Sequence, residues 1–280
     1  MQKLDRLGWA DGFSFDAYGV VMGVRATSVS VLSLVRDALP SSWTASQQTE
    51  VEWLYSIVAA GPLADGKARR FNLVYSDALQ IGRTTDLGEA LRTLERDMDL
   101  TVGERARTRV LIHAGVVAVN GRAILLPGRT LSGKSTLVAE LVRAGAVYYS
   151  DEFAVLDQEG RVHPFGRHLS IRHSINEPGE KVSAADLGAR AGERGVPVGA
   201  VIVTSYKTGA RWQPRKLSPG QCVLELLGHS LSARSAPDLV LDVLAKVVDG
   251  AEAIETRRSE AEAAAQRILA LARRNWSFGD

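Results

Sequence analysis

The chain has very little cysteine and no long apolar run. Cys222 is the single cysteine among 280 residues, which excludes a disulfide within the chain and is typical of a reducing compartment. No apolar stretch reaches the roughly 20 residues that a membrane-spanning helix needs. The first residues, MQKLDR, contain no apolar signal core. We therefore expect a cytoplasmic protein without a membrane partner.

Charge of one sign is not concentrated anywhere in the sequence. The 34 basic and 32 acidic residues are interspersed and leave a formal net charge of +2, so the composition indicates no nucleic-acid partner. Hydrophobic residues make up 45% of the chain, as in ordinary globular proteins. Cys222 lies among leucines and valines, so we expect a buried helix residue rather than a nucleophile.

Residues 1–105 form a first unit, for which we predict a small α+β domain. The predicted helices cover residues 28–39 and 86–98, the second with Asp86 as its acidic cap. Alternating apolar residues predict strands at 17–24, 51–58 and 71–75. No catalytic pattern is recognisable in this unit, and its role stays open.

Residues 106–280 form the second unit, which begins with a hairpin signal. The pair Asn120-Gly121 separates two apolar runs at 115–119 and 122–126, and this arrangement favours a tight β-hairpin. We therefore expect two antiparallel neighbours and a mixed sheet rather than the usual parallel one. Further strands are predicted at 147–150, 153–156, 161–165 and 198–204, and helices at 219–231, 237–248 and 259–275.

The segment after this hairpin, GRTLSGKS at residues 128–135, matches the phosphate-binding pattern G-x-x-x-x-G-K-[ST]. Glycines let successive N–H groups point into one concavity, and the following helix adds the positive end of its dipole. An apolar strand precedes the segment and a helical pattern follows it, which makes a glycine-rich turn with an exposed lysine the weaker interpretation. The predicted nucleotide-binding residues are Gly128, Arg129, Thr130, Leu131, Ser132, Gly133, Lys134, Ser135 and Thr136. In this loop Lys134 reaches the β- and γ-phosphates and Ser135 is a ligand for Mg²⁺.

Two adjacent carboxylates, Asp151 and Glu152, end the strand at 147–150. Ligands of α/β sheets bind at this kind of strand end. A carboxylate there can hold Mg²⁺ through water, or accept the proton of an attacking hydroxyl in phosphoryl transfer. The short separation from Lys134 favours a small kinase over a motor ATPase. The alternative is a solvated acidic turn.

Histidine and arginine side chains supply further candidates. His113 precedes the first strand of the hairpin and could interact with a carboxylate or a phosphate, although its spacing alone slightly favours a structural role. A basic run around Pro164-Phe165-Gly166 provides candidates for binding phosphate or an acidic substrate, foremost Arg167 and Arg172. The alternative is a solvated loop face. The full run is Arg161, His163, Arg167, His168, Arg172 and His173.

The segments at 112–121, 128–135 and 149–152 together resemble the C-terminal kinase domain of bacterial HPr kinase/phosphorylases. Those enzymes have a histidine before a strand pair, a phosphate loop, and paired acids after the loop helix. Residues 160–172 look like HPr-kinase-related proteins of bacterial biosynthetic clusters, including lasso-peptide kinases. The resemblance covers about residues 108–275 and implies an α/β P-loop kinase domain related to phosphoenolpyruvate carboxykinase.

The resemblance also implies roles for single residues. Asp151 matches the general base toward an acceptor serine, Glu152 its acidic neighbour, and His113 the active-site histidine. Lys134 and Ser135 match the phosphate and Mg²⁺ ligands. A possible homo-oligomer is also compatible with the resemblance.

Three functions remain open from the sequence. The leading hypothesis is an ATP-dependent kinase that uses Mg²⁺ and phosphorylates a hydroxyl, with a serine of a peptide or small protein as acceptor. The second is a kinase for a small hydroxylated metabolite, such as an amino acid or a sugar. The third is an ATP-binding regulatory switch without turnover.

Overall fold

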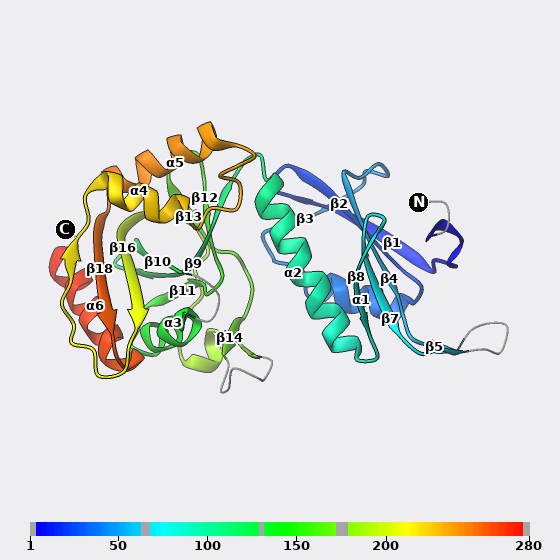
Figure 1. The fold of residues 1–280 in the computed structure, drawn as a ribbon, viewed down its shortest axis with the longest axis horizontal. Helices are drawn as coiled ribbons and strands as arrows, with labels where there is room; N and C mark the ends of the chain where they lie inside the picture. Colours follow the sequence, from blue (N-terminus) through cyan, green and yellow to red (C-terminus); the bar gives the residue numbers. More distant parts are fainter. Residues whose placement is uncertain (1–3, 63–67, 129–131, 172–178, 277–280) are drawn as a thin grey trace. The chain divides into compact units, whose positions relative to one another are not determined.

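The computed structural model describes residues 4–62, 68–128, 132–171 and 179–276 (Figure 1). The chain divides into two compact units, Met1–Arg107 and Thr108–Asp280. Each unit has its own sheet and its own helices. In the described ranges, no helix combines the length and apolarity needed to cross a membrane.

The first unit is a six-stranded sheet with two helices packed against it. The strand order is β3-β1-β2-β4-β7-β8, and only the pair β2 and β4 runs parallel. Helix α1 contacts β1 and β2, whereas α2 contacts β7 and β8. The elements are η1 (Leu4–Arg6), β1 (Asp11–Ala17), β2 (Val20–Ala26), α1 (Val29–Asp37), β3 (Thr44–Ser46), β4 (Trp53–Val58), β5 (Gly61–Pro62), β6 (Ala68–Arg69), β7 (Asn72–Ser76), β8 (Leu79–Thr84) and α2 (Leu87–Arg105).

The strand predicted at residues 17–24 is found only from Val20 onward, in β2, and the preceding strand β1 was not predicted. Tyr18 and Gly19 form a tight turn between β1 and β2, with φ values of 57° and 86°. Tyr18 is an unusual residue for this left-handed conformation. The turn could not be recognised from the sequence, because it lacks the Asn-Gly or Gly-Gly pair that usually marks a tight hairpin. The cap of α2 is confirmed, because the Asp86 carboxylate accepts a hydrogen bond from the Gly88 N–H at 2.7 Å.

The second unit contains an eight-stranded mixed sheet, which confirms the predicted mixed α/β architecture. Strand β9 pairs antiparallel with β10, β11 and β12, whereas β10, β16 and β18 are mutually parallel. The elements are β9 (Val110–Val119), β10 (Arg122–Pro127), α3 (Lys134–Arg143), β11 (Val147–Ser150), β12 (Phe153–Leu156), β13 (Arg161–His163), β14 (Leu169–Ile171), β15 (Glu180–Val182), η2 (Ala185–Leu187), β16 (Val196–Tyr206), β17 (Arg215–Lys216), α4 (Pro219–Leu227), α5 (Pro237–Asp249), β18 (Glu252–Arg258) and α6 (Ala261–Asn275).

The directions of the strands bring several strand ends to one edge of this sheet. Strands β10, β16 and β18 are parallel, and β11 runs in the same sense as β10 because both are antiparallel to β9. Their carboxyl ends therefore lie at a common edge, together with the amino-terminal part of β9. Such an edge is where α/β sheets bind ligands.

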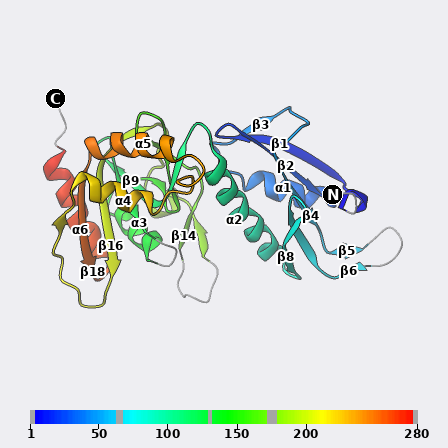
Figure 2. The ribbon, with the colours of Figure 1, turned by 45° about the horizontal axis from the view of Figure 1, so that its top comes forward.

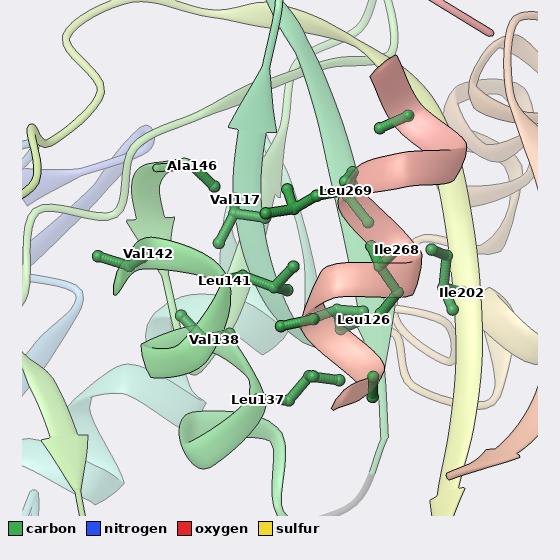
Figure 3. Close-up of a cluster of buried hydrophobic side chains, with 14 of the residues drawn as sticks. Val117, Leu126, Leu137, Val138, Leu141, Val142, Ala146, Ile202, Ile268 and Leu269 are labelled. Atoms are coloured by element: carbon green, nitrogen blue, oxygen red, sulfur yellow. The ribbon is translucent and has the colours of Figure 1, made fainter. Parts of the chain in front are cut away.

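Helices cover both faces of the sheet, because side chains of the central strands alternate between two buried cores. Ile124 and Leu126 of β10 join the core beneath α3 and α6, as Figure 3 shows for Leu126. Ala123 and Leu125 face the opposite core with α4 and α5. This period of two is the geometry of a strand buried on both faces. The result is a three-layer unit, with α4 and α5 on one side and α3 and α6 on the other (Figure 2).

Two elements of this unit differ from the sequence prediction. Helix α4 ends at Leu227 rather than at Leu231, and strand β18 was not predicted at all. In β18 buried and exposed residues alternate through its C-terminal half, but its polar sequence, EAIETRR, hides that pattern from a hydrophobicity reading. The predicted burial of Cys222 is confirmed, since it lies in α4 with 1% of its surface exposed.

Candidate phosphate-binding site

The glycine-rich segment connects β10 to α3 at the common strand edge. Gly128 follows β10, and its N–H donates to the His113 carbonyl oxygen. Gly133 caps α3 in a left-handed conformation, with φ of 79°, which glycine adopts at little cost. Arg129, Thr130 and Leu131 lie outside the described residues. The described ends of the segment therefore form the predicted strand–loop–helix arrangement.

Lys134, the first residue of α3, folds back across the loop. Its Nζ atom donates a hydrogen bond to the Gly128 carbonyl oxygen at 2.7 Å. Burial lowers the pKa of Lys134 to about 8, and the negative charges of Glu152 and Asp151 oppose this shift. The lysine is thus close enough to both carboxylates to interact with them electrostatically.

Asp151 contacts the first turn of α3 through Ser135. Its carboxylate accepts hydrogen bonds from the Ser135 hydroxyl, from the Tyr148 hydroxyl at 3.2 Å and from the Ser170 N–H at 3.1 Å. Only 8% of Asp151 is exposed, and this burial raises the pKa of the carboxyl group although the hydrogen bond from Ser135 lowers it. The bond between Ser135 and Asp151 brings the loop and the predicted acid together.

Glu152 differs sharply from its neighbour, because its side chain is exposed. Its carbonyl oxygen accepts hydrogen bonds from Nδ1 of His113 at 2.8 Å and from the Ala114 N–H at 3.0 Å. The Glu152 backbone therefore holds β9 at His113 and Ala114, while its carboxylate remains in contact with water. The two adjacent acids have different environments and are suited to different tasks.

His113 lies inside β9, not before it as the sequence indicated. The strand begins earlier because Val110, Leu111 and Ile112 are buried and pair with β12. The His113 ring stacks on Phe153 with the ring centres 5.3 Å apart. Burial and then the Lys134 charge lower the pKa of the ring, which keeps it neutral at pH 7. Because the Glu152 carbonyl can only accept, Nδ1 carries the proton and Nε2 carries the lone pair.

The basic run is divided by the structure. The Arg167 carbonyl oxygen accepts a hydrogen bond from the Tyr148 hydroxyl, which also donates to Asp151. Arg161 and His163 instead contact the β12–β13 turn, where the Asp157 carboxylate accepts from the Arg161 N–H at 2.8 Å and contacts His163 at 2.6 Å. The Arg161 guanidinium group donates to the Gly195 carbonyl oxygen at 3.0 Å. Arg172 and His173 lie outside the described residues. Of this run, Arg167 is thus the described arginine connected to the Asp151 network.

Arg258, the last residue of β18, is a site residue that the sequence interpretation missed. Its Nη2 atom donates hydrogen bonds to the carbonyl oxygens of Gly133 at 2.9 Å and Ser132 at 3.3 Å. It is 4% exposed, and burial lowers the pKa of its guanidinium group. Only the unpredicted strand β18 places this arginine at the common edge, so no local sequence signal connects it to the loop.

The donor set around Ser135 fits a magnesium ion. A hydroxyl and a carboxylate are the hard oxygen ligands that Mg²⁺ prefers, and Mg²⁺ commonly takes its remaining ligands from phosphates and water. Across the described residues, no group of three or more His, Cys, Asp or Glu side chains is arranged as a metal site. This chain thus offers a partial set of ligands that a bound polyphosphate would complete.

Comparison with known proteins gives little further guidance. No protein-family model matches the sequence. Among solved structures, the HPr(Ser) kinase/phosphatase from Coxiella burnetii is similar over 59% of this chain and 95% of that chain, with 13% sequence identity and a TM-score of 0.34. At this score the similarity establishes neither the fold nor the activity of the chain.

Proposed function

We propose that the chain is an ATP-dependent kinase that transfers the γ-phosphoryl group to a hydroxyl. The observation that carries the proposal is the hydrogen bond between Ser135 of the phosphate loop and the buried Asp151. It joins a loop suited to binding polyphosphate with a carboxylate suited to accepting a proton. Phosphoryl transfer to a hydroxyl needs such a carboxylate close to the phosphates.

The chain's own residues divide the chemistry as follows. The loop N–H groups, Lys134 and the dipole of α3 bind the phosphates. Asp151 orients the acceptor hydroxyl and takes its proton as the acceptor oxygen bonds to the γ-phosphorus. The bond from that phosphorus to the β–γ bridging oxygen breaks, which leaves ADP and a phosphate ester. The raised pKa of Asp151 suits it to hold the proton.

Ser135 would hold Mg²⁺ directly, with Asp151 and Glu152 contributing through water. When bound, the ion neutralises charge on the β- and γ-phosphate oxygens. Glu152 has an exposed carboxylate, which a contact to Mg²⁺ through water requires. His113 presents a neutral Nε2 acceptor on the same edge and helps to position the acceptor or a water molecule.

The acceptor that we propose is a serine of a peptide or small protein. A loop arginine, Arg167, has its backbone tied to Asp151 through Tyr148. Arg167 and Arg172 would bind the phosphate of the product or acidic groups of the substrate.

The experiment is transfer of radiolabelled γ-phosphate from ATP in the presence of Mg²⁺. The acceptors are fractions of a bacterial lysate, a library of serine-containing peptides, and a set of free amino acids and sugars. The variants are Lys134→Ala, which removes the phosphate contact, and Asp151→Asn, which keeps the size of the side chain but removes the base. The control is Glu193→Gln, an exposed acid outside the site.

Wild type and Glu193→Gln should label the same acceptor, whereas Lys134→Ala and Asp151→Asn should lose at least about 100-fold in rate. Asp151→Asn should still bind ATP. Label on a metabolite instead of a peptide would replace the proposed acceptor. Tight ATP binding by wild type, with no transfer to any acceptor, would refute the kinase and support a regulatory switch.

A further inference from the structure

The connection between α4 and α5, residues 228–236, pairs with the beginning of β9. Ser230 forms an isolated antiparallel bridge with Ile112. One residue further along β9, the His113 N–H donates a hydrogen bond to the His229 carbonyl oxygen at 2.8 Å. In an antiparallel pair this register places His113 and His229 directly opposite each other, with their Cβ atoms about 5 Å apart. The connection thus brings a second histidine next to the candidate residue His113.

His229 also lies next to the start of the phosphate loop. The backbone of His113 binds both: its N–H donates to His229, and its carbonyl oxygen accepts from the Gly128 N–H at 3.3 Å. Strand β10 ends at Pro127, and the α4–α5 connection continues its row beside β9. Gly128 and His229 are therefore neighbours in space, although they are far apart in the sequence.

The two histidine side chains lie on the face of the sheet that α3 covers. Odd-numbered residues of β9 face that helix. Val117 belongs to the core beneath α3 (Figure 3), and a Cβ atom on Gly115 would collide with a side chain of α3. Because side chains alternate along a strand, His113 projects from the same face, and so does His229 opposite it.

Lys134 places this pair of histidines at the phosphate end of the site. Its Nζ atom donates to the Gly128 carbonyl oxygen at 2.7 Å, and both Lys134 and His229 act electrostatically on His113. In phosphate loops this lysine reaches the β- and γ-phosphates. Both histidines are only half-buried, so a ligand can reach their rings. The surroundings favour an anion over a metal ion, since among the described residues no third His, Cys, Asp or Glu side chain completes a metal site.

We infer that His229 binds the γ-phosphoryl group and so distinguishes a nucleoside triphosphate from the diphosphate. The inference rests on the proposed function for the identity of the ligand as ATP. An imidazole carries at least one N–H in either protonation state, so His229 can donate a hydrogen bond to a phosphoryl oxygen. His113 instead donates through Nδ1 to the Glu152 carbonyl oxygen and leaves Nε2 as an acceptor, which suits the acceptor hydroxyl. The two histidines thus hold the two reacting groups, one each.

The test compares Mg-ATP with Mg-ADP by calorimetry without an acceptor, because the two ligands differ only in the γ-phosphoryl group. His229→Ala should weaken ATP binding by about 10- to 100-fold, as expected for the loss of one hydrogen bond to a charged group, and leave ADP binding within twofold. His229→Phe keeps a ring but has no N–H, and should lose as much. His229→Gln keeps a side-chain N–H donor and should recover most of the affinity for ATP.

Leu224→Ala is the matched control, because this α4 side chain is 68% exposed and lies outside the pairing with β9. It should change neither affinity. Equal losses for both nucleotides in His229→Ala would overturn the inference and show that the ring only supports the loop. Unchanged ATP affinity in both His229→Ala and His229→Phe would also overturn it. If wild type binds neither nucleotide, the inference and the proposed function both fail. If His229→Ala loses affinity for ATP alone but wild type phosphorylates no acceptor, only the kinase fails.

Discussion

Burial moves three ionisable side chains around the phosphate loop toward their neutral forms. It lowers the pKa of Lys134 and of His113, and it raises the pKa of Asp151. Each group has thus lost hydration that water would give to its charged form. A phosphate chain would restore the charge on Lys134, so ligand binding and protonation are coupled at this residue.

This coupling predicts a pH dependence for nucleotide binding. Lys134 has a pKa of about 8 in the free protein, so it is largely charged at pH 7 and largely neutral at pH 9. A bound triphosphate favours the charged form and raises that pKa. ATP affinity measured by calorimetry should therefore be nearly constant around pH 7 and then fall toward about tenfold per pH unit above pH 8.

The control for this prediction is Lys134→Arg, because a guanidinium group stays charged across the range. Its ATP affinity should be lower than that of wild type at pH 7 and nearly independent of pH up to 9.5. A wild-type affinity that stays flat between pH 8 and 9.5 would show that Lys134 does not titrate there.

The conformation of Gly133 gives a second prediction at the scale of a residue. A Cβ atom at this position would lie 2.5 Å from Nη2 of Arg258, and φ is 79°. Gly133→Ala should therefore displace Arg258 from the loop carbonyls, destabilise the protein by about 1–3 kcal/mol and weaken ATP binding more than tenfold. Thermal unfolding and calorimetry measure the two effects.

Gly145→Ala separates backbone strain from the clash. Gly145 also has positive φ, 99°, but a Cβ atom there meets nothing within 4 Å. This variant should lose stability from strain alone and keep wild-type ATP affinity. Equal affinity losses in both variants would refute a specific role for the contact between Gly133 and Arg258.

Among the elements, turns decided how much of the fold was predictable. The β9–β10 hairpin was predictable because Asn120 and Gly121 both take positive φ, at 50° and 72°, and this pair adopts such angles readily. The β1–β2 hairpin was missed because Tyr18 takes the same conformation without being a typical turn residue. Local turn chemistry is readable only where the residue type matches the geometry.

The candidate site was predictable where its parts lie close together in sequence. The loop, Lys134 and Asp151 belong to consecutive elements, so a pattern could relate them. Arg258 was not predictable, because the pairing of β16 with β18 brings it to the loop from a distant part of the chain. The burial of Asp151 was not predictable either, because two adjacent acids at a strand end read equally well as a solvated turn.

The contact between β9 and α3 gives a prediction at the scale of elements. A Cβ atom on Gly115 would lie 2.6 Å from Cγ2 of Val138, and Val138 is fully buried in α3. Gly115→Ala should push the helix away from the sheet, cost about 1–3 kcal/mol of unfolding free energy and weaken ATP binding by moving the loop. Denaturant unfolding and calorimetry provide the measurements.

Val138→Ala supplies the matched partner, because it removes the methyl group that the new Cβ atom would meet. The double variant should be more stable than the sum of the single losses indicates, with a coupling of at least about 0.5 kcal/mol. Additive losses would mean that Gly115→Ala acts through some other contact.

At the scale of the whole molecule, the phosphate loop and its neighbours belong to the second unit alone. The described residues of the loop and the Asp151 network lie within Thr108–Asp280. That unit contains two cores of its own, one on each face of its sheet. These features indicate that it is a domain able to fold independently.

A fragment of residues 108–280 should therefore fold and bind ATP within about threefold of the full chain. Circular dichroism during heating should show a single cooperative transition, and calorimetry gives the affinity. An insoluble fragment would show that the second unit does not fold without residues 1–107. An affinity more than tenfold weaker in a folded fragment would show that residues 1–107 contribute to binding. A fragment that binds ATP with full affinity but no longer transfers phosphate would indicate that the first unit recognises the acceptor.

The lone cysteine also allows local opening of the structure to be measured. Cys222 is 1% exposed in the α4–α5 layer, and burial raises the pKa of its thiol to about 11, so thiol reagents cannot modify it in the closed structure. Its rate of modification therefore counts how often this layer opens. Since ATP would bind at the strand edge next to α3 and not in the α4–α5 layer, saturating nucleotide should slow the reaction only if the layer opens together with the whole domain. An unchanged rate of Cys222 modification would show that the α4–α5 layer opens locally, without unfolding of the whole domain.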